Sequence, residues 1–324
     1  MHFAGPDFAD LRVANPGFMK TENFILASAD GVELFVYRWL PAASPIAVVQ
    51  IAHGLAEHAG RYARLAESLT AAGYAVYAND HRGHGRTAKS RDDLGFFAEQ
   101  DGWQKCLDDL WQLNRHIAAA HPGLPIIFLG HSMGSTLAER FMGEHGDALA
   151  GIVLSGANGN PTSMAAIGRG ITRAERLRLG ARGRSKLVRS LTFDAFNKKF
   201  APARTAFDWL SRDPAEVDKY VADPLCGFPA TVQLWIDLLD GWNAVSTPEH
   251  RERVPKALPI YVIAGGRDPV SGNTRQLKLW LEDYRAAGFS RLEHRFYPEA
   301  RHELFNETNR DEVTADLLGW LKQL

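Results

Sequence analysis

This chain of 324 residues has few cysteines, almost no net charge and no long apolar runs. Its two cysteines, Cys106 and Cys226, are too few for a disulfide framework, and nothing in the sequence indicates an oxidising compartment. The formal net charge of −1 at pH 7 gives no global field that would favour nucleic acid. No run of about 18 apolar residues is present, so we expect no transmembrane helix.

The first 20 residues also lack a targeting signal. A secretory signal peptide needs an apolar core flanked by positive charge, whereas this segment contains two aspartates, two prolines and two glycines. We therefore expect a soluble, cytoplasmic protein that binds no nucleic acid. The sequence leaves its oligomeric state open.

What the sequence does have is a regular alternation of predicted strands and helices. Short apolar runs predict strands, and apolar stripes at helical spacing predict helices. Such alternation is typical of the α/β class, with a mostly parallel central sheet covered by helices on both faces. The expected strands span 24–28, 33–40, 46–52, 74–78, 125–129, 151–154, 258–264 and 292–297, and the expected helices span 62–72, 102–120, 135–142, 274–287 and 310–322.

The alternation stops near residue 157 and resumes near residue 258. The stretch of roughly 90 residues in between has helical patterns, as at 231–239, but no strong strand. We interpret residues 158–245 as a helical cap inserted into an α/β core that consists of residues 1–157 and 246–324. The hydrophobic content of 45% is enough for a core of this size.

The segment from Gly130 to Gly134 reads Gly-His-Ser-Met-Gly, a G-x-S-x-G pattern between an expected strand and an expected helix. At average residue usage, a chain of this length shows the pattern by chance roughly 0.1 times. In this context it predicts a nucleophile elbow, with Ser132 on a sharp turn at the carboxyl end of its strand. The flanking glycines are needed because such a turn leaves no room for a Cβ.

A serine nucleophile needs a histidine base that is held by a carboxylate, and in this architecture the chain order is serine, acid, histidine. Asp268 is the expected acid because it directly follows the apolar strand at 258–264. An aspartate before a proline is also common in ordinary turns, which is the simpler alternative. Asp223 and Asp240 are weaker candidates because they fall in or near the cap.

His302 is the expected base. It lies between the last predicted strand and the last predicted helix, after the acid in the chain. His294 lies within that strand and His250 lies where the cap ends, so both are weaker candidates.

Catalysis by such a serine also needs two backbone N–H groups that point at the developing oxyanion. Met133, the residue after the nucleophile, is expected to supply one of them. We expect the second from Leu55, in the loop after the strand at 46–52, where His53 and Gly54 shape the backbone.

The segment from Asp80 to Arg86 reads Asp-His-Arg-Gly-His-Gly-Arg. These residue types could hold a metal ion or a phosphate. We favour the simpler interpretation, a rigid loop after a strand that is held by Asp80 and the arginines.

Together these motifs resemble the α/β-hydrolases of the monoacylglycerol lipase and lysophospholipase group, which is linked to the serine aminopeptidases (S33). The resemblance covers almost the whole chain from about residue 22. Its motifs are specific for the fold and the triad, and much less specific for the substrate. It is carried by His53-Gly54-x-x-Glu57-His58-x-x-Arg61-Tyr62, Asp80 to Gly85, Gly130 to Gly134, Asp223 to Gly227, Gly266 to Val270 and Arg301-His302-Glu303.

The resemblance implies an α/β-hydrolase fold whose helical cap shapes an acyl pocket, with no cofactor and no metal ion. It implies Ser132 as nucleophile, Asp268 as acid and His302 as base, with oxyanion donors at Leu55 and Met133. Ala56 departs from the pattern, because animal monoacylglycerol lipases usually have glycine there, so their identity does not transfer directly.

We therefore expect a serine hydrolase of carboxylic esters that acts on small acyl esters, most simply monoacylglycerols or lysophospholipids. An aminopeptidase or amidase with the same triad stays open, and it would need acidic groups such as Asp237 or Asp240 in the pocket. A non-catalytic binding protein on a hydrolase scaffold is a remote alternative.

The cap is rich in basic and aromatic residues. Residues 169–189 include eight basic residues and one acid. Such a face fits peripheral contact with an anionic lipid surface, but we favour a solvated helix that is balanced by acids elsewhere. Some aromatic side chains are expected to pack on the core and others to line the acyl pocket, from the set Phe193, Phe196, Phe200, Phe207, Trp209, Phe228, Trp235 and Trp242.

Overall fold

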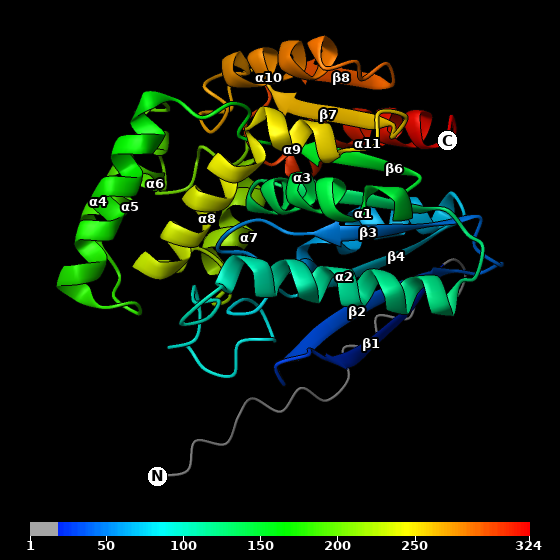
Figure 1. Cartoon of the computed structure of the whole chain (residues 1–324), viewed down its shortest axis with the longest axis horizontal. Coiled ribbons are helices and arrows are strands. Elements are labelled where there is room, and N and C mark those ends of the chain that lie inside the picture. Colours follow the sequence, from blue (N-terminus) through cyan, green and yellow to red (C-terminus); the bar gives the residue numbers. More distant parts are fainter. Residues whose placement is uncertain (1–18) are drawn as a thin grey trace.

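An eight-stranded sheet forms the centre of the computed structural model, which describes residues 19–324 (Figure 1). The expectation about a signal peptide falls almost entirely on residues 1–18, outside this range. In spatial order the strands are β1 (Met19–Ala27), β2 (Glu33–Pro41), β4 (Tyr74–Asn79), β3 (Ala47–Ala52), β5 (Ile126–His131), β6 (Gly151–Ser155), β7 (Ile260–Gly265) and β8 (Leu292–Tyr297).

The sheet is mostly parallel, which confirms the predicted class. Only β1 with β2 and β2 with β4 pair antiparallel, while the strands from β4 to β8 run parallel. Every residue of β3, β4, β5 and β7 is buried, as expected for strands covered on both faces. β1 begins five residues before its predicted start because it is a half-exposed edge strand without a continuous apolar run.

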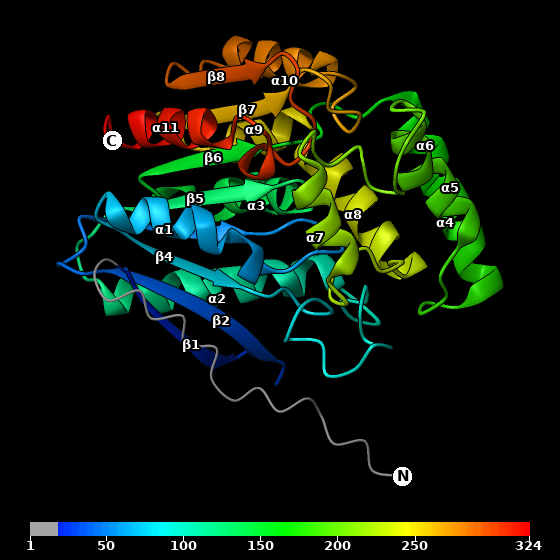
Figure 2. The same cartoon turned by 180° about the vertical axis from the view of Figure 1, so that it is seen from behind.

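Helices cover both faces of the sheet (Figures 1 and 2). On one face, α2 (Gly102–Ala120), α3 (Met133–His145) and α10 (Arg275–Ala286) pack into the larger apolar core. On the other face, α1 (Ala63–Ala71) and α11 (Arg310–Leu321) pack into the second core. Within residues 19–324, no helix is both long and apolar enough to span a bilayer.

The chain between β6 and β7 is helical and carries residues 158–245, which we name the cap segment. Its outer helices stand away from the sheet at the left of Figure 1, while α8 packs on α2 and α3. Its treatment as a separate domain stays a prediction. The helices between the two strands are α4 (Ser163–Leu179), α5 (Lys186–Leu191), α6 (Phe193–Lys198), α7 (Pro214–Ala222), α8 (Val232–Val245) and α9 (Pro248–Arg253).

Most of the eight basic residues between positions 169 and 189 have polar partners, which agrees with the simpler interpretation of the charge there. Acids balance five of the eight, and Arg184 donates to the carbonyl oxygens of Leu94 and Pro229. The ion pairs join Arg169 and Arg173 to Asp240, Arg178 to Glu175, Arg182 to Asp93, and Arg189 to Asp194.

Candidate active site

Ser132 stands on the sharp turn between β5 and α3. Its backbone lies in the left-handed region, with φ 54° and ψ −118°, and its N–H donates to Ser155 O at 3.0 Å. A Cβ on Gly130 would lie 2.3 Å from Gly134 O, and one on Gly134 would lie 2.1 Å from Ala52 O. Both glycines are therefore required by close backbone approach, as the sequence motif predicts.

Asp268 and His302 lie together at the carboxyl end of the same sheet. Asp268 follows β7, is fully buried, and accepts a hydrogen bond from Val270 N at 2.9 Å. Its Oδ2 lies 2.9 Å from Nδ1 of His302, which follows β8 and is 2% exposed. The weaker candidates lie elsewhere, because Asp223 pairs with His58 and His294 is exposed on β8.

The ring of His302 is fixed by its neighbours. Its centroid lies 4.8 Å from that of His131 and 5.0 Å from that of Trp209. Burial acts to lower the pKa of His302, but the charge and the hydrogen bond of Asp268 outweigh it and raise that pKa above the usual 6.5. Burial and the nearby His302 lower the pKa of His131 to about 4, so His131 is neutral at pH 7.

The loop after β3 passes directly against Ser132, since a Cβ on Gly54 would lie 3.2 Å from Ser132 Cβ. The Gly54 N–H is already used, because it donates to Glu57 Oε1 at 2.6 Å. In the described part of the chain, the backbone N–H groups of Leu55 and Met133 donate no hydrogen bond. These two groups are thus available to an oxyanion beside Ser132.

Buried histidines support this loop without carrying charge. His53 Nδ1 lies 2.8 Å from Gly54 O, and its Nε2 accepts a hydrogen bond from His81 N at 3.0 Å. Burial lowers the pKa of His81 to about 3 and that of His84 to about 4, so both are neutral at pH 7. The adjoining Asp80 accepts from backbone N–H groups, which agrees with the rigid-loop interpretation of that segment.

Arg61 joins the loop after β3 to the loop that carries His302. Its guanidinium makes two hydrogen bonds to Glu303, at 2.7 and 2.6 Å, and one to Glu57 at 2.5 Å. Glu57 in turn accepts from Gly54 N and from the Tyr62 hydroxyl. Burial acts to raise the pKa of Glu303, but Arg61 holds it well below the usual 4.5.

A cavity of about 320 Å³ opens at Ser132, His302, Leu55 and Met133. It has the size of a small ligand pocket and is mostly apolar, as is usual for such pockets. Five of the eight predicted cap aromatics line it, whereas Phe200, Phe207 and Phe228 do not. The five are Phe193, Phe196, Trp209, Trp235 and Trp242.

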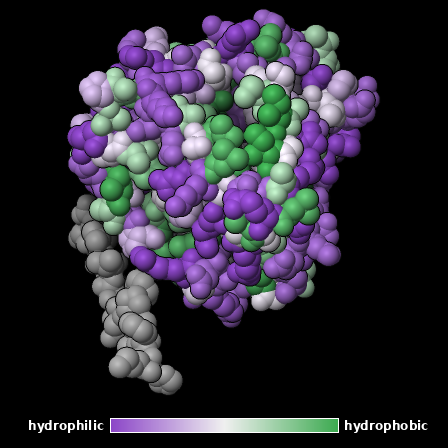
Figure 3. All heavy atoms as spheres, turned by 90° about the vertical axis from the view of Figure 1, so that its left-hand side faces the viewer, coloured by the Kyte–Doolittle hydropathy of each residue, from purple (hydrophilic) through white to green (hydrophobic). Residues whose placement is uncertain are grey.

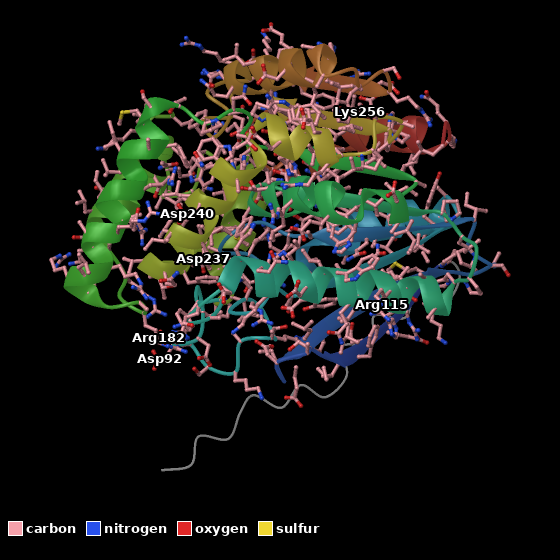
Figure 4. The ribbon with its side chains drawn as sticks, viewed as in Figure 1. Asp92, Arg115, Arg182, Asp237, Asp240 and Lys256 are labelled. Carbon is pink, nitrogen blue, oxygen red and sulfur yellow. The ribbon has the colours of Figure 1, made fainter. Side chains whose placement is uncertain are left out.

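The two acids expected for an aminopeptidase pocket are not in this cavity, which corrects that expectation. Asp240, labelled on α8 in Figure 4, accepts hydrogen bonds from two arginines of α4. Asp237 accepts from Gln233 and faces the start of α2. The carboxylates that do line the cavity, on Glu57 and Glu303, are both paired with Arg61.

The comparison with known proteins agrees with this geometry. A family model described as "Serine aminopeptidase, S33" matches residues 43–309. The chain is 32% identical over 298 residues to a monoacylglycerol lipase of Mycolicibacterium smegmatis, covering 91% of this chain and 95% of the relative. It is 29% identical over 301 residues to the monoglyceride lipase of Homo sapiens, covering 88% of each chain.

A solved structure with a closely similar fold is a thermostable carboxyl esterase from Bacillus coagulans, in complex with glycerol. The two chains superpose with a TM-score of 0.86 at 26% identity, covering 94% of this chain and 98% of the esterase.

Sequence reasoning assigned no role to the Arg61 network. The charges of Glu57, Arg61 and Glu303 were visible within the motifs, but their pairing depends on contacts between residues up to 242 positions apart. The Arg61 network could have been predicted from one signal, a charged residue inside a motif that is otherwise expected to be buried.

Replacing Arg61 with methionine should lower the free energy of unfolding at pH 7 by about 3–5 kcal/mol, because it leaves two buried carboxylates without a partner. The pKa of Glu303 is lower in the folded state than in the unfolded chain. The ionised carboxylate therefore contributes its whole stabilisation of the fold at a pH above its unfolded pKa, and this contribution is lost as the pH falls. The difference in the free energy of unfolding between the wild type and the Arg61→Met variant should therefore become smaller below pH 4.5. Urea unfolding at pH 7 and at acidic pH measures both effects.

The matched control is Arg204→Met, which removes an exposed ion pair with Asp218. That change should cost at most about 1 kcal/mol. Equal losses in the two variants would contradict a structural role for the Arg61 network.

Proposed function

This chain belongs to the serine aminopeptidase S33 family of α/β-hydrolases, and we propose that it is a serine hydrolase that cleaves monoacylglycerols or lysophospholipids. The family, the monoacylglycerol lipase relatives and the esterase structure support the broader statement that it is a carboxylic ester hydrolase. Ser132, Asp268 and His302 are the proposed triad, with Leu55 and Met133 as oxyanion donors.

One observation carries the proposal: a serine on a strained elbow shares an apolar cavity with a buried histidine that is hydrogen-bonded to a buried aspartate. Asp268 holds a proton on Nδ1 of His302, which leaves Nε2 as the acceptor for the Ser132 proton. The raised pKa of His302 suits a base that becomes an imidazolium during the reaction.

In the proposed mechanism, Ser132 Oγ attacks the ester carbonyl while His302 takes its proton. The tetrahedral oxyanion is bound by the N–H groups of Leu55 and Met133. His302 then protonates the leaving alcohol, and water cleaves the acyl-enzyme by the same route. Asp268 orients His302 and stabilises its charged form.

The apolar lining of the cavity favours an acyl chain over an amino acid. The ammonium group of an aminopeptidase substrate would need an unpaired carboxylate, because a buried charge without a partner is costly. Both carboxylates in the lining are bound to Arg61. This observation makes aminopeptidase activity the weaker of the two functional hypotheses.

The cap segment supports a further part of the proposal, contact with a lipid–water interface. Large apolar side chains stay exposed on α4 and α5 although most of the basic charges nearby are paired, and Figure 3 shows apolar side chains around a hollow on this side. Leu177 is the most exposed of them at 89%. Met164, Ile167 and Leu191 also line the cavity, so the exposed surface is continuous with the pocket.

Steady-state kinetics on a panel of monoacylglycerols, lysophospholipids and an amino-acid arylamide test the reaction. We expect kcat/KM for the best monoacyl ester to exceed that for the arylamide by at least about 10²-fold, because the cavity leaves an ammonium group unpaired. Ser132→Ala should lower kcat by roughly 10⁴–10⁶-fold and abolish labelling by a fluorophosphonate. A faster arylamide, or a Ser132→Ala variant near wild-type activity, would refute the assignment.

The activity should fall as pH decreases through the pKa of His302, because only the neutral imidazole accepts the serine proton. Since that pKa is raised, the midpoint of the acidic limb of kcat/KM should lie above pH 6.5. Asp268→Asn should shift the midpoint downward and lower kcat by about 10⁴-fold, as in serine proteases. Asp218→Asn, at an exposed position on α7, is the matched control, and a midpoint that stays unchanged in Asp268→Asn would contradict the pairing.

Sedimentation with lipid vesicles tests the interface. Leu177→Ser should weaken vesicle partitioning by about tenfold, since a leucine loses at least about 1.4 kcal/mol of apolar transfer when replaced by a polar residue. Ile25→Ser, at an exposed position on β1 that is 54% accessible, should leave partitioning unchanged. Equal partitioning of both variants and the wild type would exclude this face as the contact.

A further inference from the structure

A second cluster of reactive side chains lies outside the proposed triad, where the cap segment meets the loop after β3. His58, Asp223 and Cys226 each offer one ligand atom here, and these atoms all lie within 4.8 Å of one another. Among residues 19–324, no other group of three histidine, cysteine or acidic side chains meets this condition. The proposed hydrolysis gives none of the three a role.

The backbone holds these side chains in place. Asp223 follows α7, and Cys226 N donates to Asp223 O at 3.0 Å, closing a tight turn. Gly227 N then donates to Ala56 O at 2.9 Å, which fastens the turn to the loop that contains His58. His58 Nε2 lies 2.9 Å from Asp223 Oδ2, so two of the three ligand atoms already touch.

The ligand types and their spacing fit Zn²⁺. Histidine nitrogen, cysteine sulfur and carboxylate oxygen are its three usual protein ligands, and Asp223-x-x-Cys226 has the two-residue spacing of many zinc sites. Bond lengths of about 2.0–2.3 Å place tetrahedral ligand atoms about 3.3–3.8 Å apart. His58 Nε2 and Asp223 Oδ2, now 2.9 Å apart, need to separate by only a fraction of an ångström to bind one ion. A water molecule can take the fourth coordination position.

The surrounding charge also favours a cation. The positive charge of Arg61 acts on Cys226, but it is already matched by Glu57 and Glu303. Asp223 adds one more negative charge directly at the cluster. His58 Nδ1 is buried without a hydrogen-bond partner, so the ring can carry its proton there while Nε2 binds a metal.

We propose that His58, Asp223 and Cys226 form a binding site for Zn²⁺ or a similar soft divalent cation, which ties the cap segment to the loop after β3. Binding forms bonds from the metal to His58 Nε2, Asp223 Oδ and Cys226 Sγ, and breaks the His58–Asp223 hydrogen bond. The thiol proton is released to solvent, because only the thiolate binds the metal. The His58 ring binds the metal through Nε2 and carries its proton on Nδ1.

The test is calorimetric titration of the full chain, without a polyhistidine tag and after treatment with a chelator, with Zn²⁺. We expect one ion per chain and a higher thermal midpoint with metal. Titration with Co²⁺ should add an absorption band from thiolate-to-metal charge transfer, which reports sulfur ligation directly.

Cys226→Ser and His58→Gln should each weaken Zn²⁺ binding by at least about tenfold, and Cys226→Ser should remove the charge-transfer band. Cys106→Ser, at the other buried cysteine, is the matched control and should bind as wild type does. If Cys226→Ser does not fold, His58→Gln decides. No binding by the wild type, or equal binding by the wild type and the folded variants, overturns the site.

Discussion

The left-handed backbone at Ser132 is the constraint on which the rest of the site depends. A non-glycine residue in such a conformation costs on the order of 1–3 kcal/mol and persists only where its surroundings enforce it. Here the enforcement is steric and comes from three adjacent strands. Gly134 is pressed against the Ala52 carbonyl at the end of β3, and Ser132 N is bound to the end of β6. The sheet order β3-β5-β6 therefore fixes the direction of Ser132, the proposed nucleophile.

The remaining groups are held by buried polar contacts that cross between elements. Arg61 binds Glu57 in the loop after β3 and Glu303 beside His302, so one guanidinium positions both sides of Ser132. Buried ion pairs contribute little net stability, but breaking one is costly, so they specify geometry more than they add to folding. The cap segment adds to this hold, because Gly227 N and the Tyr220 hydroxyl both donate to Ala56 O.

Local patterns predict most of this fold because its strands are buried and its helices are amphipathic. Seven of the eight strands were predicted to within two residues, and β1 was shortened because an exposed edge strand has a weak apolar signal. The outer helices of the cap segment were harder to predict from the sequence for the same reason. α4 has 17 residues, of which only Thr172 and Glu175 are buried, so it has no buried apolar stripe.

The proposed triad and oxyanion residues could be predicted from the sequence because each lies in the loop after a strand or at the start of a helix, where local rules apply. The cavity walls could not, since they come from side chains whose neighbours are set by tertiary packing. Asp237 shows the difference: it lies only two residues from Trp235, which lines the cavity, yet it faces α2 instead. On a helix a shift of two positions reverses the face that a side chain presents. Local motifs are thus enough to predict the proposed reaction chemistry, whereas the lining of the cavity depends on how the cap helices are oriented over the elbow.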